Sequence, residues 1–356
     1  MLRQLLPKKW LRGRAPRLSG TVDVVIPVYR GVAETRSCIE SVLVAPTTTP
    51  REVIVIDDHS PEPELPPWLA GLAAERRITL LTHAENRGFV ASVNEGMALH
   101  GDRDVVLLNS DTEVAAGWLD RLAACVRRDA AIGTITPFST NATICSYPRN
   151  HGPNAMPAGE TTASLDRAFA AANAERSADI PTAVGFCMYI TRHCLHRVGP
   201  FDHDRYGEGY GEEVDFCMRA ARRGFRNVIA ADVFVHHVGE VSFAGSGAER
   251  RQKAQAMVDA LYPEFQRRLA AFLPADPLRG LRRRADLERL RRVPHELTRE
   301  STQGRVKLAW NRPGEEFALW LDPGRDSAGL EAIERCVRDP AAPLPELDPR
   351  WLSEGS

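Results

Sequence analysis

The four apolar residues VVLL at 105–108 run directly into the polar tripeptide Asn109-Ser110-Asp111. An uninterrupted apolar run of this kind is typical of a strand that is buried on both faces, as in a parallel sheet covered by helices. The tripeptide then follows the carboxyl end of the strand, which is the edge where open α/β sheets bind their ligands. This segment therefore predicts an architecture and, within it, the position of a site.

The first 110 residues alternate between strand and helix patterns. We expect strands at 22–28, 52–56, 78–81 and 105–108, and helices at 34–44, 68–76 and 94–100. Such alternation predicts an α/β fold with a Rossmann-like, mostly parallel central sheet flanked by helices.

The rest of the chain is less regular. We expect helices at 164–175, 212–223 and 248–273, strands at 184–191, 228–231 and 233–235, and a hairpin from 306–310 and 317–321. Pro274 and Pro277 indicate a linker. The predicted division is a basic arm at 1–20, a main domain at 21–273 and a small, mainly helical C-terminal extension of unknown role at 274–356.

The charge distribution limits the class of partner. A net charge of −1 argues against capture of nucleic acid by the molecule as a whole. Two segments are basic, because 1–17 has no acidic residue and 279–292 has seven arginines. Each is interpreted either as a contact with an anionic membrane surface or as a solvated tail or helix face.

A membrane span, a secretory signal and a disulfide framework are not expected. No apolar run approaches the roughly 18–20 residues that cross a bilayer, and charges and Pro7 interrupt the N-terminal segment. Seven cysteines without metal-type spacing favour buried thiols in a reducing compartment. We therefore expect a cytoplasmic protein, in solution or peripheral at the inner face of the membrane.

Asn109 and Asp111 carry side-chain oxygens two positions apart. Such oxygens are the ligands of hard divalent cations, which in turn hold diphosphates. A turn followed by a helix cap accounts for the same residues. The tripeptide alone leaves both interpretations open.

Asp57-Asp58 ends the second expected strand, where an acid often accepts hydrogen bonds from a ribose or a base. A dinucleotide-dependent oxidoreductase uses such an acid, but it also needs a G-x-G-x-x-G turn after the first strand. Here that strand runs into Pro27-Val28-Tyr29-Arg30-Gly31. The oxidoreductase is therefore disfavoured, and helix capping remains an alternative for Asp58.

Asn86-Arg87-Gly88 follows the third expected strand and precedes Asn94. Arg87 is suited to meet a phosphate, and Gly88 lets the backbone approach a ligand closely. A loop turn before a helix is the alternative.

Glu212, Glu213 and Asp215 begin an expected helix after a stretch rich in glycine and tyrosine. The helix dipole alone favours acids there, but crowded carboxylates also raise one another's pKa, which suits a general base. Further on, His236-His237 closes an apolar strand. An imidazole at a strand end suits a metal, and only one of two adjacent side chains is expected to reach the site.

Taken in order, these segments resemble a family 2 glycosyltransferase with the GT-A fold over roughly residues 22–245. The segments that carry the resemblance are VVIPVY (24–29), VIVIDDHS (53–60), ENRGFVASVNEG (85–96), LLNSDTEV (107–114), VGFCMYITR (184–192), VGPFD (198–202), GYGEEVDFCMRA (209–220) and FVHHVGEVSF (234–243). Eight segments in family order make the resemblance specific.

The resemblance implies a role for each matching position. Asp111 and His237 would hold a divalent cation, Mn²⁺ or Mg²⁺, with Asn109 standing where the family has the first acid of its D-x-D motif. Glu213 would be the catalytic base, where aspartate is usual, with Glu212 or Asp215 as the alternatives. The residues implied to line the nucleotide sugar are Pro27, Tyr29, Asp57, Asp58, Asn86, Arg87, Gly88, Asn94, Asn109, Ser110, Gly185 and Phe186.

The implied activity is inverting transfer of a sugar from a nucleotide-diphosphate sugar to a hydroxyl of a glycan or lipid-linked glycan. Bacterial surface polysaccharide or O-antigen assembly is the expected setting. The alternative is a catalytically inactive sugar-nucleotide-binding or scaffolding protein of the same fold. A nucleotidyltransferase is disfavoured, because residues 29–35 lack a glycine-rich basic loop.

Overall fold

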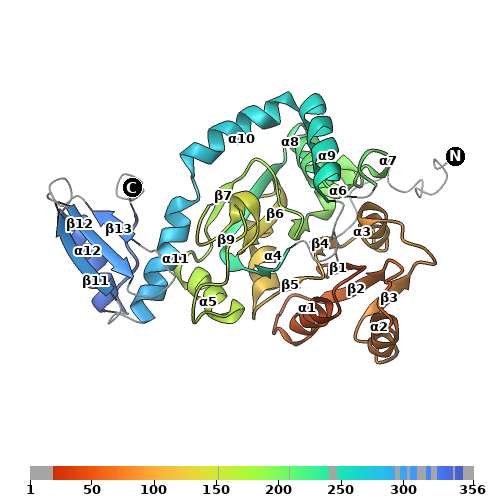
Figure 1. The fold of residues 1–356 in the computed structure, drawn as a ribbon, viewed down its shortest axis with the longest axis horizontal. Helices are drawn as coiled ribbons and strands as arrows, with labels where there is room; N and C mark the ends of the chain where they lie inside the picture. The colour runs from red at the N-terminus through yellow and green to blue at the C-terminus, as the bar shows by residue number, and fades with distance from the viewer. Residues whose placement is uncertain are drawn as a thin grey trace.

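The computed structural model describes residues 19–150, 152–207, 209–239, 247–292, 297–302, 305–310, 318–321, 327–339 and 341–347. Within these residues the largest sheet has eight strands in the order β3-β2-β1-β4-β8-β6-β9-β7 (Figure 1). They are β1 (Val22–Val28), β2 (Arg51–Asp57), β3 (Thr79–Thr82), β4 (Asp104–Leu108), β6 (Ile132–Phe138), β7 (Ser177–Asp179), β8 (Cys187–Ile190) and β9 (Arg226–Phe234).

Strands β1 to β4 form the parallel half of the sheet. β1 pairs in parallel with β2 and β4, and β2 pairs in parallel with β3. β8 is antiparallel to both β4 and β6, so the sheet is mixed beyond β4. The predicted α/β fold with a mostly parallel central sheet is confirmed.

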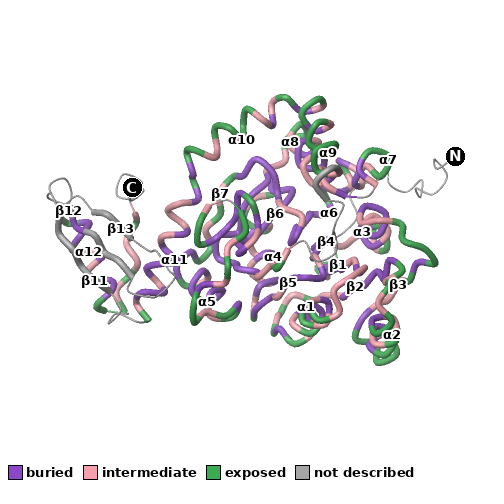
Figure 2. Tube along the Cα trace, in the orientation of Figure 1, coloured by how far each residue is buried: buried purple, intermediate pink, exposed green. Residues whose placement is uncertain are grey.

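Helices cover both faces of this sheet. The helices before β10 are α1 (Val32–Val44), α2 (Leu65–Ala74), α3 (Phe89–Ala98), α4 (Trp118–Arg128), α5 (Thr162–Ala172), α6 (Arg192–Val198), α7 (His203–Tyr206) and α8 (Glu212–Ala221). In β1, Val24 and Ile26 belong to the core cluster that also contains residues of α1, α2, α4 and α5, whereas Val25 belongs to the cluster with residues of α3, α6 and α8. Figure 2 shows the resulting buried centre and exposed outer helix faces. The run at 105–108 is apolar throughout because it too has a core on each side.

Two segments, 226–234 and 247–275, are divided into strands and helices differently from the sequence-based expectation. The segments expected at 228–231 and 233–235 are one strand, β9, because the intervening Asp232 is buried and accepts a hydrogen bond from the Glu175 N–H at 3.0 Å. The single helix expected at 248–273 is two, α9 (Gly247–Leu261) and α10 (Pro263–Ala275). Pro263 ends α9 because the residue before a proline is driven out of the helical conformation, and Tyr262 has φ −135°.

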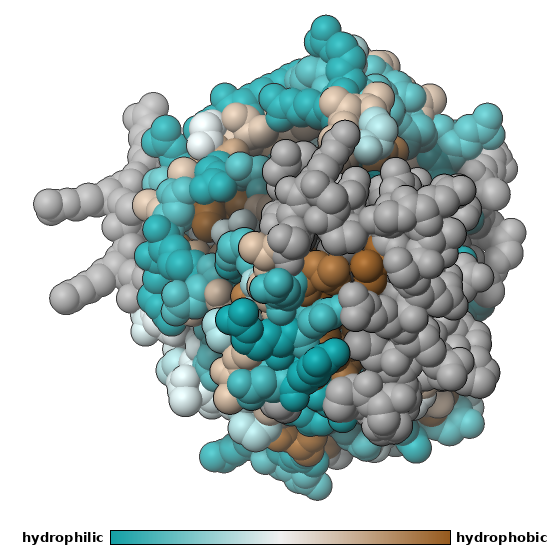
Figure 3. All heavy atoms as spheres, turned by 90° about the vertical axis from the view of Figure 1, so that its left-hand side faces the viewer, coloured by the Kyte–Doolittle hydropathy of each residue, from teal (hydrophilic) through white to brown (hydrophobic). Residues whose placement is uncertain are grey.

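The C-terminal extension contains a sheet as well as helices. α11 (Arg279–Arg292) is followed by the three-stranded sheet of β11 (Leu297–Thr302), β12 (Arg305–Trp310) and β13 (Ala318–Leu321), and by α12 (Ser327–Arg338). The expected hairpin is confirmed by the antiparallel pairing of β12 with β13, whereas β11 and α12 were not predicted. Figure 1 shows this sheet at the end of the molecule beyond α11, and the described residues on that face are mainly hydrophilic (Figure 3).

Residues 279–292 form a largely buried helix rather than a solvated helix face. Arg282, Arg284 and Arg289 in α11 are buried, and α11 packs along α5. Arg289 Nε donates to Glu160 at 2.8 Å, Arg284 Nε donates to the Ala172 carbonyl at 2.9 Å, and Arg282 pairs with Asp276. The arginines are tolerated inside because each has a polar partner there. The basic arm, in contrast, lies almost entirely outside the described residues.

All seven cysteines are free and buried, which confirms the expectation of buried thiols. Among the described residues, no helix combines the length and the apolar character needed to cross a bilayer.

Candidate active site

The predicted site residues of the first half gather at one edge of the sheet. Because β1 to β4 are parallel, their carboxyl ends are adjacent. Tyr29 follows β1, Asp58 follows β2 and Asn109 follows β4. Tyr29 also lies under the Arg30 guanidinium, 5.2 Å from ring centroid to Cζ. Chain order and strand polarity thus assemble this part of the site.

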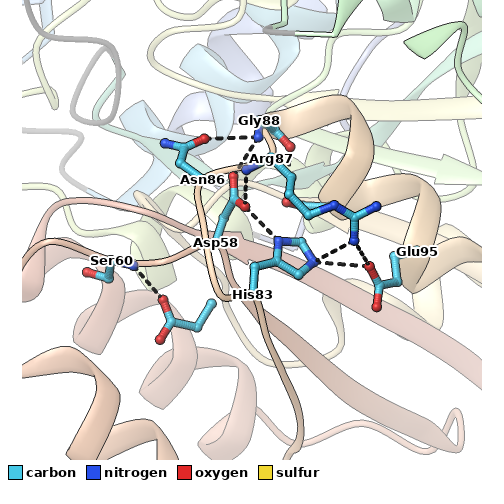
Figure 4. Close-up of polar contacts among 9 residues, drawn as sticks. Asp58, Ser60, His83, Asn86, Arg87, Gly88 and Glu95 are labelled. Atoms are coloured by element: carbon cyan, nitrogen blue, oxygen red, sulfur yellow. Dashed lines mark hydrogen bonds and ion pairs between the residues drawn. The ribbon is translucent and has the colours of Figure 1, made fainter.

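The Asp58 carboxylate holds the loop at 86–88 in place (Figure 4). Its Oδ1 accepts from the Arg87 N–H at 2.8 Å and lies 2.6 Å from His83 Nδ1, and its Oδ2 accepts from the Gly88 N–H at 2.8 Å. Asn86 Oδ1 accepts from the same Gly88 N–H at 2.9 Å. Gly88 has φ 84°, a left-handed conformation that favours glycine.

Asp57 and Asn94 have structural partners. Asp57 Oδ1 accepts from the Ser60 N–H at 2.8 Å and so shapes the turn after β2. Asn94 donates from Nδ2 to the Phe201 carbonyl at 2.9 Å and accepts from the Phe201 N–H at 3.0 Å. This geometry favours Asn94 as the anchor of the loop before α7 rather than as a direct contact of the nucleotide sugar.

A second, two-stranded sheet brings His237 to Asp111. β5 (Thr112–Glu113) pairs antiparallel with β10 (His236–His237), and His237 is directly opposite Thr112. His237 Nε2 then lies 3.4 Å from Asp111 Oδ1 and 3.5 Å from Asn109 Nδ2. Of the two adjacent histidines, only His237 faces Asp111, because His236 Nδ1 contacts the Thr140 hydroxyl at 2.9 Å.

The backbone around His237 sets its tautomer. Nδ1 is 2.6 Å from the Asn141 carbonyl, which can only accept, so Nδ1 carries the hydrogen. When the ring is neutral, the lone pair of Nε2 is directed at the Asp111 carboxylate, and two electron-pair donors then face each other across 3.4 Å. A nitrogen and a carboxylate in this arrangement suit a divalent cation, so the donor set fits the predicted metal.

Asp111 is ionised in this setting. Burial of Asp111 works against its charged form, but a protonated His237, through its hydrogen bond and its charge, and the Gly239 N–H together lower the pKa of Asp111 below the usual value. The Gly239 N–H donates to Asp111 Oδ2 at 2.9 Å. Ser110, between the two polar residues, is buried.

A different acidic group lies at the opposite edge of the sheet. Asp23, Glu52 and His100 have ligand-type atoms within 4.8 Å of one another. Arg103 Nη1 already contacts both carboxylates, at 3.0 Å from Asp23 and 2.5 Å from Glu52. Because a guanidinium neutralises these acids, we favour Asp111 and His237 as the metal site.

Gly185 and Phe186 lie between the metal residues and α8. The Phe186 ring stacks on His237 with centroids 5.1 Å apart. The backbone carbonyl of Phe186 accepts a hydrogen bond from the Asn109 N–H at 2.9 Å. Space is open where a Gly185 side chain would be. Two residues earlier, the Ala183 N–H contacts Cys217 Sγ in α8 at 3.3 Å. This segment therefore connects the metal residues with the acids that begin α8.

Glu212 and Glu213 differ from Asp215. Among the described residues, the Oε2 atoms of Glu212 and Glu213 are buried without a hydrogen-bond partner. Asp215 uses both oxygens, accepting from Tyr262 Oη at 2.6 Å and from Arg219 Nε at 2.7 Å. Burial raises the pKa of Glu213, and burial together with the charge of Glu213 raises that of Glu212. The two glutamates are thus the better candidates for proton transfer.

The sequence did not point to His83, Glu95, Asn141 or Gly239. His83 follows β3 as Asp58 follows β2, so its position at a strand end was an available signal. Asn141 and Gly239 act through backbone groups, which leave no residue-type signal.

The fold and the polar strand ends define a GT-A type glycosyltransferase architecture. Among solved structures, GalNAc-T7 with UDP, GalNAc and Mn²⁺ is similar, with a TM-score of 0.52 and 15% sequence identity over 85% of this chain and 67% of that one. At this identity the likeness concerns the fold alone.

Residues 23–199 match the model of the family described as glycosyl transferase family 2. This matched part of the chain belongs to that family. The Sinorhizobium fredii (strain NBRC 101917 / NGR234) uncharacterized protein y4gI is 23% identical over 258 residues, 67% of this chain and 27% of that protein. A Drosophila melanogaster protein, putative polypeptide N-acetylgalactosaminyltransferase 13, is 31% identical over 118 residues, 30% of this chain and 21% of that protein. The alignments thus span about a quarter of the curated relatives.

Proposed function

We propose that this chain is an inverting glycosyltransferase that moves a sugar from a nucleotide-diphosphate sugar to a hydroxyl of a glycan or lipid-linked glycan. The observation that carries the proposal is the pair formed by His237 Nε2 and Asp111 Oδ1, 3.4 Å apart at the carboxyl edge of the sheet. Bacterial surface polysaccharide or O-antigen assembly, in the cytoplasm or at the inner membrane face, is the setting that we propose.

Asp111 and His237 would hold the cation, with Asn109 beside them. A bound Mn²⁺ or Mg²⁺ would neutralise the charge that develops on the leaving diphosphate. GalNAc-T7, which has the same fold, was solved with UDP and Mn²⁺. Asp58 and the loop at 86–88 would receive the nucleotide at the neighbouring strand ends.

Glu213 would act as the general base. The acceptor oxygen forms a bond to the anomeric carbon while the bond from that carbon to the diphosphate oxygen breaks. Glu213 takes the proton of the acceptor hydroxyl, and the nucleoside diphosphate leaves with the bonding electron pair. Attack from the face opposite the diphosphate inverts the anomeric centre. A general base accelerates such a step by roughly 10²–10⁴-fold.

A thermal-shift screen tests the proposal. UDP-, GDP-, dTDP- and CMP-sugars are added with and without Mn²⁺. A ligand at a hundredfold excess over its Kd stabilises the folded state by about 2.7 kcal/mol, so the cognate donor should raise Tm in a Mn²⁺-dependent way. Asp111→Ala should abolish that rise, whereas Glu213→Gln should preserve it.

Glu52→Gln is the matched control, because it removes a carboxylate from the acidic group at the opposite edge. It should leave the Mn²⁺-dependent rise unchanged. A rise that is lost in Glu52→Gln and retained in Asp111→Ala would contradict the assigned metal site. No rise with any donor would favour the inactive scaffold.

A further inference from the structure

His83 is held at both ring nitrogens by carboxylates from different elements. It follows β3 and is 7% exposed. Nδ1 is 2.6 Å from Asp58 Oδ1, and Nε2 is 3.0 Å from Glu95 Oε2 on α3 (Figure 4). A buried ring with both nitrogens engaged has one orientation, so His83 is a rigid connection between the end of β2 and α3.

The contact with Asp58 determines how that carboxylate is turned. An ionised carboxylate only accepts hydrogen bonds, so Nδ1 is the donor in this contact. The other donors to Asp58 are the backbone N–H groups of Arg87 and Gly88, each at 2.8 Å. Three donors from two segments thus fix one carboxylate, and through it the loop at 86–88.

The second nitrogen reaches the side chain of the same loop. Arg87 Nη1 donates to Glu95 Oε2 at 2.8 Å and lies 3.4 Å from His83 Nε2. The Arg87 side chain is 48% exposed, so its free donors face solvent at the edge of the site. Glu95 therefore holds Arg87 at one point and leaves the remainder of the guanidinium available to an anion.

We propose that His83 is a positioning residue for the donor nucleotide, acting through its Nδ1–H bond to Asp58. His83 fixes the carboxylate and the loop that meet the nucleotide. This inference rests on the proposed function, because it takes Asp58 and the loop at 86–88 to be the nucleotide contacts.

Two substitutions at His83 test the contributions of its two ring nitrogens separately. The amide nitrogen of asparagine falls near the position of histidine Nδ1, and that of glutamine near the position of Nε2. His83→Asn therefore retains a donor for Asp58, whereas His83→Gln retains only the contact with Glu95. Calorimetry measures the affinity of each full-length variant for UDP, GDP and dTDP in Mn²⁺.

We expect His83→Gln to weaken nucleotide binding about tenfold, the effect of losing one hydrogen bond to a charged group. His83→Asn should retain most of the affinity. Mn²⁺ affinity without nucleotide should be the same in both variants, because Asp111 and His237 are untouched. If His83 had a merely structural role, its substitution would not lower the affinity for nucleotide while leaving the affinity for Mn²⁺ unchanged.

His100→Gln is the control for loss of stability, because it too removes a donor at the Nδ1 position. His100 Nδ1 contacts the Asp23 carboxylate at 3.0 Å, but at the opposite edge of the sheet. This variant should bind nucleotide as the wild type does. Equal affinity in all variants, better binding by His83→Gln than by His83→Asn, or an equal loss in His100→Gln would each overturn the role of His83. Failure of the wild type to bind any of the three nucleotides would instead overturn the proposed function.

Discussion

At the scale of single residues, Glu213 should give the reaction its pH dependence. Burial raises the pKa of Glu213 above 4.5, its ordinary value. A base must be ionised to accept a proton, so kcat/KM should fall as the pH decreases through this raised pKa. Glu213→Gln should lower kcat by roughly 10²–10⁴-fold and remove the acidic limb. A pH–rate profile of both proteins measures this. An acidic limb that persists in Glu213→Gln would assign the base to another acid, with Glu212 next to be tested.

Gly239 should be required for metal binding for two reasons. A side chain there would collide with Asn141, and the positive φ of Gly239 disfavours any residue with a Cβ. A Cβ on Gly239 would be 1.9 Å from Asn141 Nδ2, and φ is +84°. The Gly239 N–H holds Asp111, and the Asn141 carbonyl holds His237. Gly239→Ala should therefore weaken Mn²⁺ binding about 10–100-fold, as is typical when the groups that orient metal ligands are lost. Titration with Mn²⁺ monitored by electron paramagnetic resonance measures the affinity.

Gly224→Ala is the matched control. Gly224 has φ +86° but open space around its Cβ position, so the alanine has the same backbone strain without the contact. Its Mn²⁺ affinity should equal that of the wild type. A similar loss in both glycine variants would mean that general strain, rather than the contact with Asn141, weakens the site.

At the scale of elements, α11 should stabilise the metal site indirectly, through Tyr147 and the segment that holds His237. Tyr147 is fully buried, donates to Asp286 at 2.6 Å and accepts from Arg289 Nη1 at 2.7 Å. Its N–H donates to the Ser139 carbonyl at 2.8 Å, two residues before the Asn141 carbonyl that holds His237. Tyr147→Phe leaves buried charges without their hydrogen bonds, so the free energy of unfolding should fall by about 1–3 kcal/mol. Mn²⁺ affinity should fall with it.

Tyr189→Phe is the control that distinguishes a general loss of stability from a specific loss of Mn²⁺ affinity. Tyr189 is also buried, and it donates to Asp104 at 2.7 Å at the start of β4, the end remote from Asp111. Denaturant unfolding and Mn²⁺ titration are measured on both variants. Tyr189→Phe should lose stability but keep its metal affinity. If Tyr147→Phe also keeps its metal affinity, α11 contributes to stability alone.

At the scale of the whole molecule, local patterns were sufficient for the parallel half of the sheet. An apolar run such as that at 105–108 can be recognised from adjacent residues alone, and its composition indicates that both faces of the strand are covered. The strands and the polar residues at their ends were therefore predictable. Asp58 and Asn109 reach one edge because parallel strands share their direction. The bounds of α9 and α10 were not predicted, since a helical pattern continues across Pro263 although the backbone does not.

The sequence by itself determined the α/β architecture and the edge where the site lies. Only the tertiary structure decided which polar groups meet. His237 reaches Asn109 across 128 positions through two-residue strands, which are too short to carry a period. Likewise, the arginines of α11 resemble a solvated face until Glu160 and Tyr147 are found opposite Arg289. Local patterns follow from near neighbours, whereas the partner of a buried polar group depends on the path of the entire chain.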